Sequence, residues 1–283
     1  MKKLNLFIII VCIMCFILPG HAQNDKKSRK HHNIMLGFEF GSDFFFGDPI
    51  KSDMVRENKS SYYSFHDFDY YCGLIPDYQE MNVLYFGIKP EFFFCKNRMG
   101  LSTGLRVSRY STIFDSDKDY FLWLVNQDDI NTEYVKIRDI TQNSYYLGIP
   151  LDFRFFPNRR ELPFQFYLKA GSVFNYRLHT NNKVNFQNKS MKSNSEIIDN
   201  QIDSSIDDFN AYMFLGFGFK IGRYKASGRK IPYFNVEMHA LNIMLTDKAS
   251  SFIRTNAGIG FQLSAQIPLG KTAPIGSRYL PGI

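Results

Sequence analysis

The alternation of apolar and polar side chains is the clearest signal in this sequence. Apolar residues recur at every second position over eight segments of 14 to 17 residues, at 33–46, 82–95, 99–112, 143–156, 162–178, 209–222, 231–245 and 252–268. A period of two is typical of β-strands whose two faces meet different surroundings. Ordinary globular strands have ~5–6 residues, whereas a tilted strand that crosses a bilayer needs ~9–11 residues plus its ends. The lengths therefore favour membrane-spanning strands.

The links between these segments alternate in length. Short links occupy 96–98, 157–161 and 222–230, links of 30 or more residues occupy 47–81, 113–142 and 179–208, and the last link, 246–251, is short. Short turns on one side, long loops on the other and an even number of strands are typical of outer-membrane barrels. We therefore expect an all-β fold, an eight-stranded antiparallel transmembrane β-barrel with long extracellular loops, over residues 33–269.

The two faces of the segments differ in charge and size. Charged side chains share one face with glycines such as Gly87, Gly148 and Gly216. Because the inside of a narrow barrel is crowded, we expect this face to line the lumen and the apolar face to meet lipid. A soluble lipocalin-like barrel with its apolar face inside is the alternative. The predicted lumen ion network consists of Glu39, Lys89, Glu91, Arg106, Asp152, Arg154, Lys169, Lys220, Glu237 and Arg254.

Aromatic residues gather at the strand ends and in the long loops. Phe92 and Phe164 near the short turns, and Tyr145 and Tyr176 near the long loops, are placed as the two interfacial girdles of such a barrel. The candidate loop contacts, which a protein partner or a saccharide would meet, are Tyr62, Tyr63, Phe68, Tyr70, Tyr71 and Trp123. A cap that collapses over the barrel mouth is the alternative explanation for these loop aromatics.

The ends of the chain predict export. Lys2 and Lys3 precede an apolar run over 4–18, and small residues follow up to Ala22, which is the pattern of a signal peptide over residues 1–22. An uncleaved anchor helix is the alternative. We expect a basic periplasmic leader over 23–32, a periplasmic C-terminal tail over 270–283, and a location in the cell outer membrane.

Composition narrows the function further. Hydrophobic residues make up 45% of the 283 residues, which excludes disorder throughout. Without the signal peptide the chain has 32 Lys and Arg against 27 Asp and Glu, and this net charge of +5 is too weak and too scattered for nucleic-acid binding. Cys72 lies in the first long loop and Cys95 at the far end of the predicted strand 82–95, which spans roughly 40 Å. This is far beyond the ~7 Å limit of a disulfide, so we expect two free thiols.

Candidate catalytic and metal motifs are incomplete. Residues 265–272 match a relaxed P-loop, but the prolines and glycines that follow exclude the helix such a loop requires. The acidic loop that begins at Asp115 lacks the glycine and glutamate of a calcium-binding loop, which leaves loose divalent binding as the alternative. Glu237 and His239 share a face without a nearby serine, so a lipid-modifying enzyme is the least favoured interpretation. We predict no catalytic residues, no cofactor and no metal.

Two segments carry a resemblance to a known family. The stretch YYLGIPLDFRFF over 145–156 resembles the "YLEIPL"-type strand of PorT-like outer-membrane β-barrel proteins, and FYLKAG over 166–171 is similar to the strand that follows it there. The chain has Gly148 where that family usually has glutamate. The resemblance implies an accessory component of an outer-membrane protein secretion system, with envelope proteins as partners. The residues themselves favour a non-enzymatic barrel, structural or interacting through its external loops, with outer-membrane lipid around it.

Overall fold

A computed structural model of the chain describes residues 33–49, 55–56, 79–95, 98–115, 120–127, 132–157, 164–203, 206–222 and 232–269. The chain divides into Met1–His32 and Asn33–Ile283, and every described residue belongs to the second unit. The predicted signal peptide, leader and C-terminal tail lie outside the described residues. No described helix is long and apolar enough to cross a membrane.

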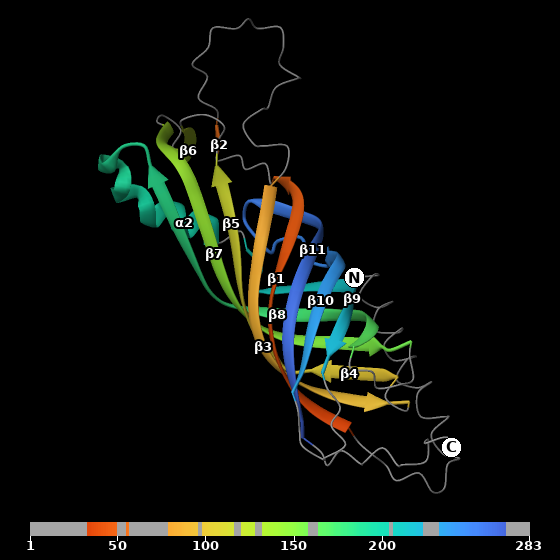
Figure 1. The fold of residues 1–283 in the computed structure, drawn as a ribbon. Coiled ribbons are helices and arrows are strands. Elements are labelled where there is room, and N and C mark those ends of the chain that lie inside the picture. The colour runs from red at the N-terminus through yellow and green to blue at the C-terminus, as the bar shows by residue number, and fades with distance from the viewer. Residues whose placement is uncertain are drawn as a thin grey trace, which may run out of the picture. The chain divides into compact units, whose positions relative to one another are not determined.

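The described unit consists almost entirely of strands (Figure 1). The strands are β1 (Asn33–Pro49), β2 (Val55–Arg56), β3 (Gln79–Phe94), β4 (Met99–Thr103), β5 (Leu105–Asp115), β6 (Phe121–Gln127), β7 (Thr132–Phe155), β8 (Phe164–Phe186), β9 (Phe209–Ile221), β10 (Tyr233–Met244) and β11 (Ile253–Pro268). A 3₁₀ helix, η2 (Lys189–Asn194), runs into the α-helix α2 (Ser195–Asp203). Each predicted segment falls on one of the long strands or on the β4–β5 pair.

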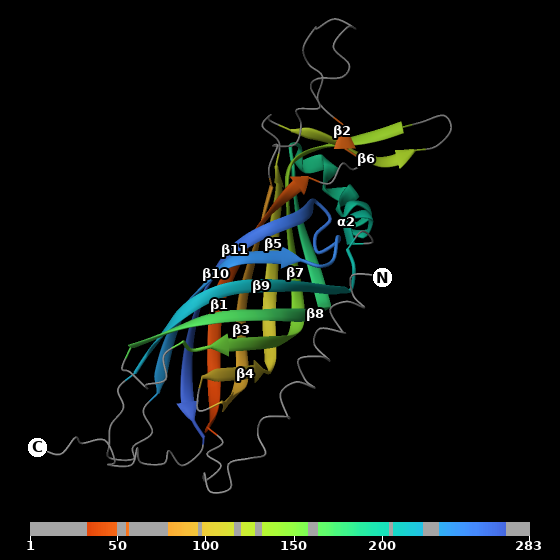
Figure 2. The ribbon, with the colours of Figure 1, turned by 90° about the vertical axis from the view of Figure 1, so that its right-hand side faces the viewer.

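Antiparallel pairing closes these strands into a ring, which confirms the predicted eight-stranded barrel. β1 pairs with β3 on one side and with β11 on the other, although residues 33–49 and 253–268 lie at opposite ends of the sequence. β4 and β5 are two parts of one strand between β3 and β7, and β7 continues through β8, β9 and β10 to β11 (Figure 2). The ring has no free edge, so its backbone groups are paired within the wall.

Burial alternates along the strands as the sequence predicts. Residues of β5 are alternately exposed and buried from Leu105 to Asp115. Large apolar side chains face outward all around the ring and are 48–59% exposed, among them Phe40, Phe86, Leu105, Ile149, Leu168, Leu215, Phe234 and Leu263. The charged face points inward, where Arg106 and Arg154 are among the largest fully buried side chains. The lipocalin-like arrangement, with the apolar face inside, is therefore wrong.

A bulge corrects the predicted facing of one strand. The register of β1 against β11 shifts between Phe46 and Gly47, so that Phe46 pairs with Ala257 but Gly47 pairs with Thr255. The extra residue lies in β11 between Thr255 and Ala257, and it exchanges the inward-facing and outward-facing positions of the residues that precede it in this strand. Ile253 is therefore buried in the lumen, and Arg254 points outward with its side chain 65% exposed and 3.8 Å from Asp247. The prediction that Arg254 belongs to the lumen network was wrong.

Two predicted loops contain regular structure. The link 113–142 includes β6 and the first half of β7, and the link 179–208 includes the end of β8, η2 and α2. β5, β7 and β8 thus continue past the ring, and β6 pairs with the extended part of β7 from Phe121 to Gln127. Together these elements form a folded cap at the end of the ring where the long links lie.

Candidate functional site

The lumen holds a continuous ion network in its middle. Glu39 accepts from Lys89 Nζ at 2.6 Å and from Arg106 Nε at 2.7 Å. Lys89 also contacts Asp152, which lies 3.3 Å from Lys169 Nζ. All five side chains are 0–1% exposed. Because burial strips water from each charge, each must be balanced by its neighbours.

The network continues toward the short turns. Lys169 Nζ lies 2.6 Å from Glu237, whose second oxygen accepts from Arg154 at 2.5 Å. Arg154 also donates to Glu91 at 2.8 Å, and Gln266 Nε2 donates to the same Glu91 oxygen. The structure therefore brings together eight of the ten predicted residues, which are Glu39, Lys89, Glu91, Arg106, Asp152, Arg154, Lys169 and Glu237.

A second branch, which the sequence analysis did not connect to the network, contains Asp43 and His239. Tyr212 accepts from Arg106 Nη1 at 2.9 Å and donates to Asp43 at 3.0 Å. Asp43 also pairs with His239 Nδ1 at 2.8 Å, and the imidazole stacks on Phe214 at 4.3 Å. The branch adds a fifth carboxylate, Asp43, to the four carboxylates that contact the four Lys and Arg side chains of the network.

A signal for Asp43 was present in the sequence. It lies two residues beyond Gly41 and four beyond Glu39 on the same face of β1, so the period of two placed it in the lumen. Its partner His239 comes from β10, about 200 residues away in the chain. Only the order of strands around the ring brings them together.

Aromatic side chains close the lumen at the short-turn end. Met35, Phe93, Phe156 and Tyr167 form one buried cluster there. Lys220 lies over the ring of Tyr233 at 4.1 Å and near those of Phe93 and Phe156 at 5.2 and 5.9 Å. Lys220 thus faces the lumen as predicted, but its described contacts are with aromatic faces at the lumen's end.

The long-loop end of the lumen is closed as well. Phe45, Tyr85, Tyr110, Tyr146 and Tyr212 belong to a buried cluster above the ion network. The turn between β10 and β11 folds onto this cluster, because Ala249 is 2% exposed and its carbonyl accepts from Tyr146 at 3.3 Å. Between its two ends the lumen is filled by the side chains of the ion network, which are 0–1% exposed.

Trp123, a predicted loop contact, is buried inside the cap. It is 3% exposed, packs with Phe121, Ile137 and Ile198, and donates from Nε1 to Gln201 at 2.8 Å. The prediction of an exposed contact is therefore wrong for Trp123, and the alternative of a collapsed cap describes it. The other candidate loop contacts, Tyr62, Tyr63, Phe68, Tyr70 and Tyr71, lie outside the described residues.

One buried glutamine fastens the cap to the barrel mouth. Gln142 Oε1 accepts from Ser250 Oγ at 2.9 Å and from the Ser251 backbone N–H at 3.0 Å. Its Nε2 donates to Ser251 Oγ at 2.9 Å, and that hydroxyl donates to the carbonyl of Ile202 in α2 at 2.9 Å. Strand β7, the β10–β11 turn and α2 are thereby linked through hydrogen bonds.

The chemistry available at His239 is limited by its surroundings. The imidazole is 0% exposed and, among the described residues, no serine or cysteine hydrogen-bonds to it. A hydrolytic triad needs a nucleophile in contact with the histidine and a path for the substrate. The described residues contain no cluster of three or more His, Cys, Asp or Glu side chains arranged to hold a metal ion. The Asp43–His239 pair is a buried hydrogen-bonded pair within the lumen network.

Comparison with known proteins adds a distant likeness in fold. No protein-family model matches the chain, and no curated protein matches it. Among solved structures, the outer membrane protein OprG from Pseudomonas aeruginosa is similar, with 11% sequence identity and a TM-score of 0.30 over 83% of this chain and 93% of that one.

Proposed function

We propose that this chain is a non-enzymatic outer-membrane β-barrel protein that acts through its folded cap. The carrying observation is the filled lumen: Glu39, Lys89, Arg106 and Asp152 cross the middle of the barrel at 0–1% exposure. A ring of eight strands has room for side chains but little else. The apolar outer face of the ring supports a lipid surrounding, because water would not cover so many exposed Phe, Leu and Ile side chains favourably.

The cap supports a role in contact with other molecules. Its core of Phe121, Trp123, Val135 and Ile137 is separate from that of the lumen, so this part of the chain has a shape of its own. A rigid barrel that presents a folded element beyond the membrane is a common way to hold a binding surface. Protein partners in the envelope are the class that this arrangement fits.

A conductance measurement tests the proposal. Purified protein reconstituted into planar bilayers should insert, as judged by protection of the ring from protease, and should give no steady ion current. A stable ohmic conductance in the wild type would contradict a filled lumen. Failure of the folded protein to enter vesicles at all would contradict the outer-membrane assignment.

The second candidate function is an accessory role in a secretion system. The observation that favours it is the resemblance of residues 145–156, on β7, to the corresponding strand of PorT-like proteins. Cross-linking of outer membranes followed by purification of the tagged chain would distinguish the two roles. Recovery of a defined set of secretion components favours the accessory role, and recovery of surface proteins or of the chain alone favours the first proposal.

A further inference from the structure

One sector of the outer wall changes from apolar to polar in two steps. Cross-strand pairs run in rows over β3, β5, β7 and β8, and the three successive rows are Phe86–Val107–Leu147–Tyr176, Leu84–Arg109–Tyr145–His179 and Asn82–Ser111–Asn143–Asn181. Neighbouring rows lie two residues apart on β3, β5 and β7, or ~6.6 Å along the strands, and a bulge in β8 adds one residue between Tyr176 and His179. The first row is apolar apart from one hydroxyl and the third is wholly polar, so the middle row lies at the border of the apolar belt.

Arg109 in the middle row is held in place without an acidic partner. Its Nε and Nη2 donate to Asn143 Oδ1 at 3.1 and 2.8 Å. Because this oxygen is engaged by the guanidinium, the amide N–H groups of Asn143 remain as further donors. No carboxylate of a described residue forms an ion pair with Arg109, whereas Arg177 pairs with Asp203 and Asp208.

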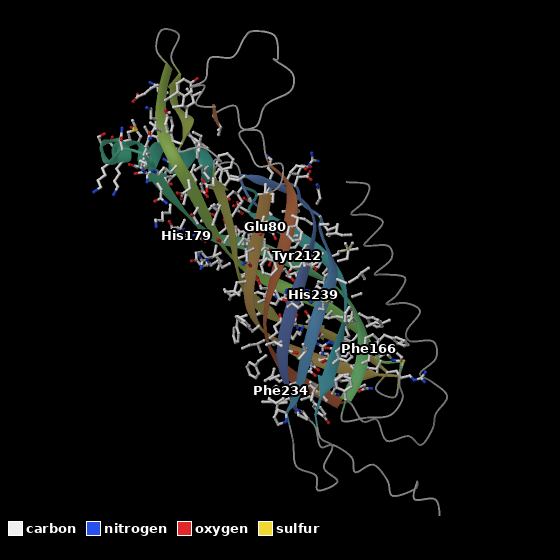
Figure 3. All side chains as sticks on the ribbon, turned by 45° about the horizontal axis from the view of Figure 1, so that its top comes forward. Glu80, Phe166, His179, Tyr212, Phe234 and His239 are labelled. Atoms are coloured by element: carbon white, nitrogen blue, oxygen red, sulfur yellow. The ribbon has the colours of Figure 1, made fainter. Side chains whose placement is uncertain are left out.

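The donors of this sector surround one tyrosine. Arg109 and His179 are the two cross-strand neighbours of Tyr145, which is 38% exposed. The strands that carry Arg109 and His179 are therefore ~10 Å apart, with the strand of Tyr145 between them. His179 lies on the outer side of the wall, away from Tyr212 and His239 in the lumen (Figure 3).

We propose that Arg109, Asn143 and His179 form a site for the phosphate headgroup of an anionic lipid in the leaflet around the cap end. The proposal rests on the outer-membrane location proposed above. Guanidinium groups recognise phosphate through parallel N–H···O bonds, and tyrosines at the border of the apolar belt lie at headgroup level. A phosphate placed over Tyr145 would receive donors from both sides, while its acyl chains would lie along Val107, Leu147 and Tyr176.

Native mass spectrometry of the protein in nanodiscs tests this site. The discs are made of phosphatidylcholine with a minor share of phosphatidic acid as the probe, and lipids that stay bound on release are counted. Wild type should retain phosphatidic acid in preference to phosphatidylcholine. Arg109→Gln should lower that retention about tenfold, because a hydrogen-bonded ion contact is lost. Arg109→Lys, which keeps the charge, should retain an intermediate amount.

The matched control is Arg254→Gln. Arg254 is an outward-facing arginine near the same end, and it lies beside Asp247. Equal retention by Arg109→Gln and wild type, or an equal loss in the Arg254→Gln variant, would overturn the site. Displacement of phosphatidic acid by an equal concentration of inorganic phosphate would overturn its assignment to lipid. If wild type enters the discs and shows no preference, this inference fails alone, whereas failure to enter them removes the proposed location.

Discussion

Arg154 is the position at which the lumen network can be tested most directly. Its guanidinium is 1% exposed and lies 2.8 Å from Glu91 and 2.5 Å from Glu237. Replacement by Met keeps a similar length and removes the charge. Glu237 would keep Lys169 at 2.6 Å, but Glu91 would keep only the amide of Gln266. The substitution therefore leaves one buried carboxylate without a cation.

The expected cost follows from that orphaned carboxylate. Removal of one partner from a buried ion pair lowers the free energy of unfolding by about 3–5 kcal/mol, because the remaining charge is neither solvated nor balanced. Arg154→Met should fall in that range. The double variant Arg154→Met/Glu91→Gln, in which the charge is removed as well, should recover roughly 2 kcal/mol. Arg254→Met should change the free energy by less than about 1 kcal/mol, because its pair with Asp247 is largely exposed.

The assay is urea unfolding of protein folded into vesicles. The heat-modifiable gel mobility reports the barrel, and fluorescence reports the cap, because Trp123 is the only tryptophan in the sequence. The Arg154→Met transition should shift to lower urea in the gel assay. If Arg154→Met is no less stable than Arg254→Met, the lumen pairs are not structural. If the double variant is as unstable as the single one, the orphaned carboxylate is not the cause.

Further predictions concern the wall, the cap and the turns. Leu215→Arg should lower the free energy of unfolding in the urea assay by roughly 2–4 kcal/mol, because Leu215 is 55% exposed on the apolar belt. Gly218→Val should instead block folding, because a Cβ there would lie 2.6 Å from the Tyr167 ring. Trp123→Ala should make the cap sensitive to protease and leave the barrel folded. A change in the heat-modifiable gel mobility, which reports the barrel, would contradict this prediction. Burial raises the pKa of the Asp199 carboxyl in α2, so the folded cap binds this proton more tightly than the unfolded cap. The protonated Asp199 therefore stabilises the cap at low pH, and this stabilisation is lost as the pH rises above the usual pKa of an aspartate. Asp199→Asn should flatten this pH dependence. The measurement is hydrogen exchange of the α2 amides, corrected for intrinsic exchange rates. Cys95, an exposed free thiol in the β3–β4 turn, should react with an impermeant maleimide only after the outer membrane is opened, and labelling in intact cells would reverse the topology.

Local pattern was sufficient for the barrel wall. The period of two located the strands and assigned charged and glycine positions to one face, because successive side chains of a strand point to opposite sides whatever their partners are. This rule alone correctly assigned Glu39, Lys89 and Asp152 to the lumen. The same rule places Asp43 in the lumen, two residues beyond Gly41 on the same face of β1.

Contacts between distant segments decided the rest. Arg254 faces outward because β11 has one more residue than β1 at the bulge, and a bulge depends on how two strands pair. Trp123 is buried because β7 continues past the ring and α2 returns to cover β6, whereas aromatic content alone fits a buried cap and an exposed loop equally well.

The sequence by itself therefore determined which residues form the wall and which face they occupy. The tertiary structure alone determined which lumen charges meet, where β11 changes its facing, and that the loops build a cap. The physical reason is the range of the interactions. Alternation is fixed by the geometry of a single strand, whereas the pairing of Asp43 with His239 requires two strands 196 residues apart to become neighbours through β11 in a closed ring.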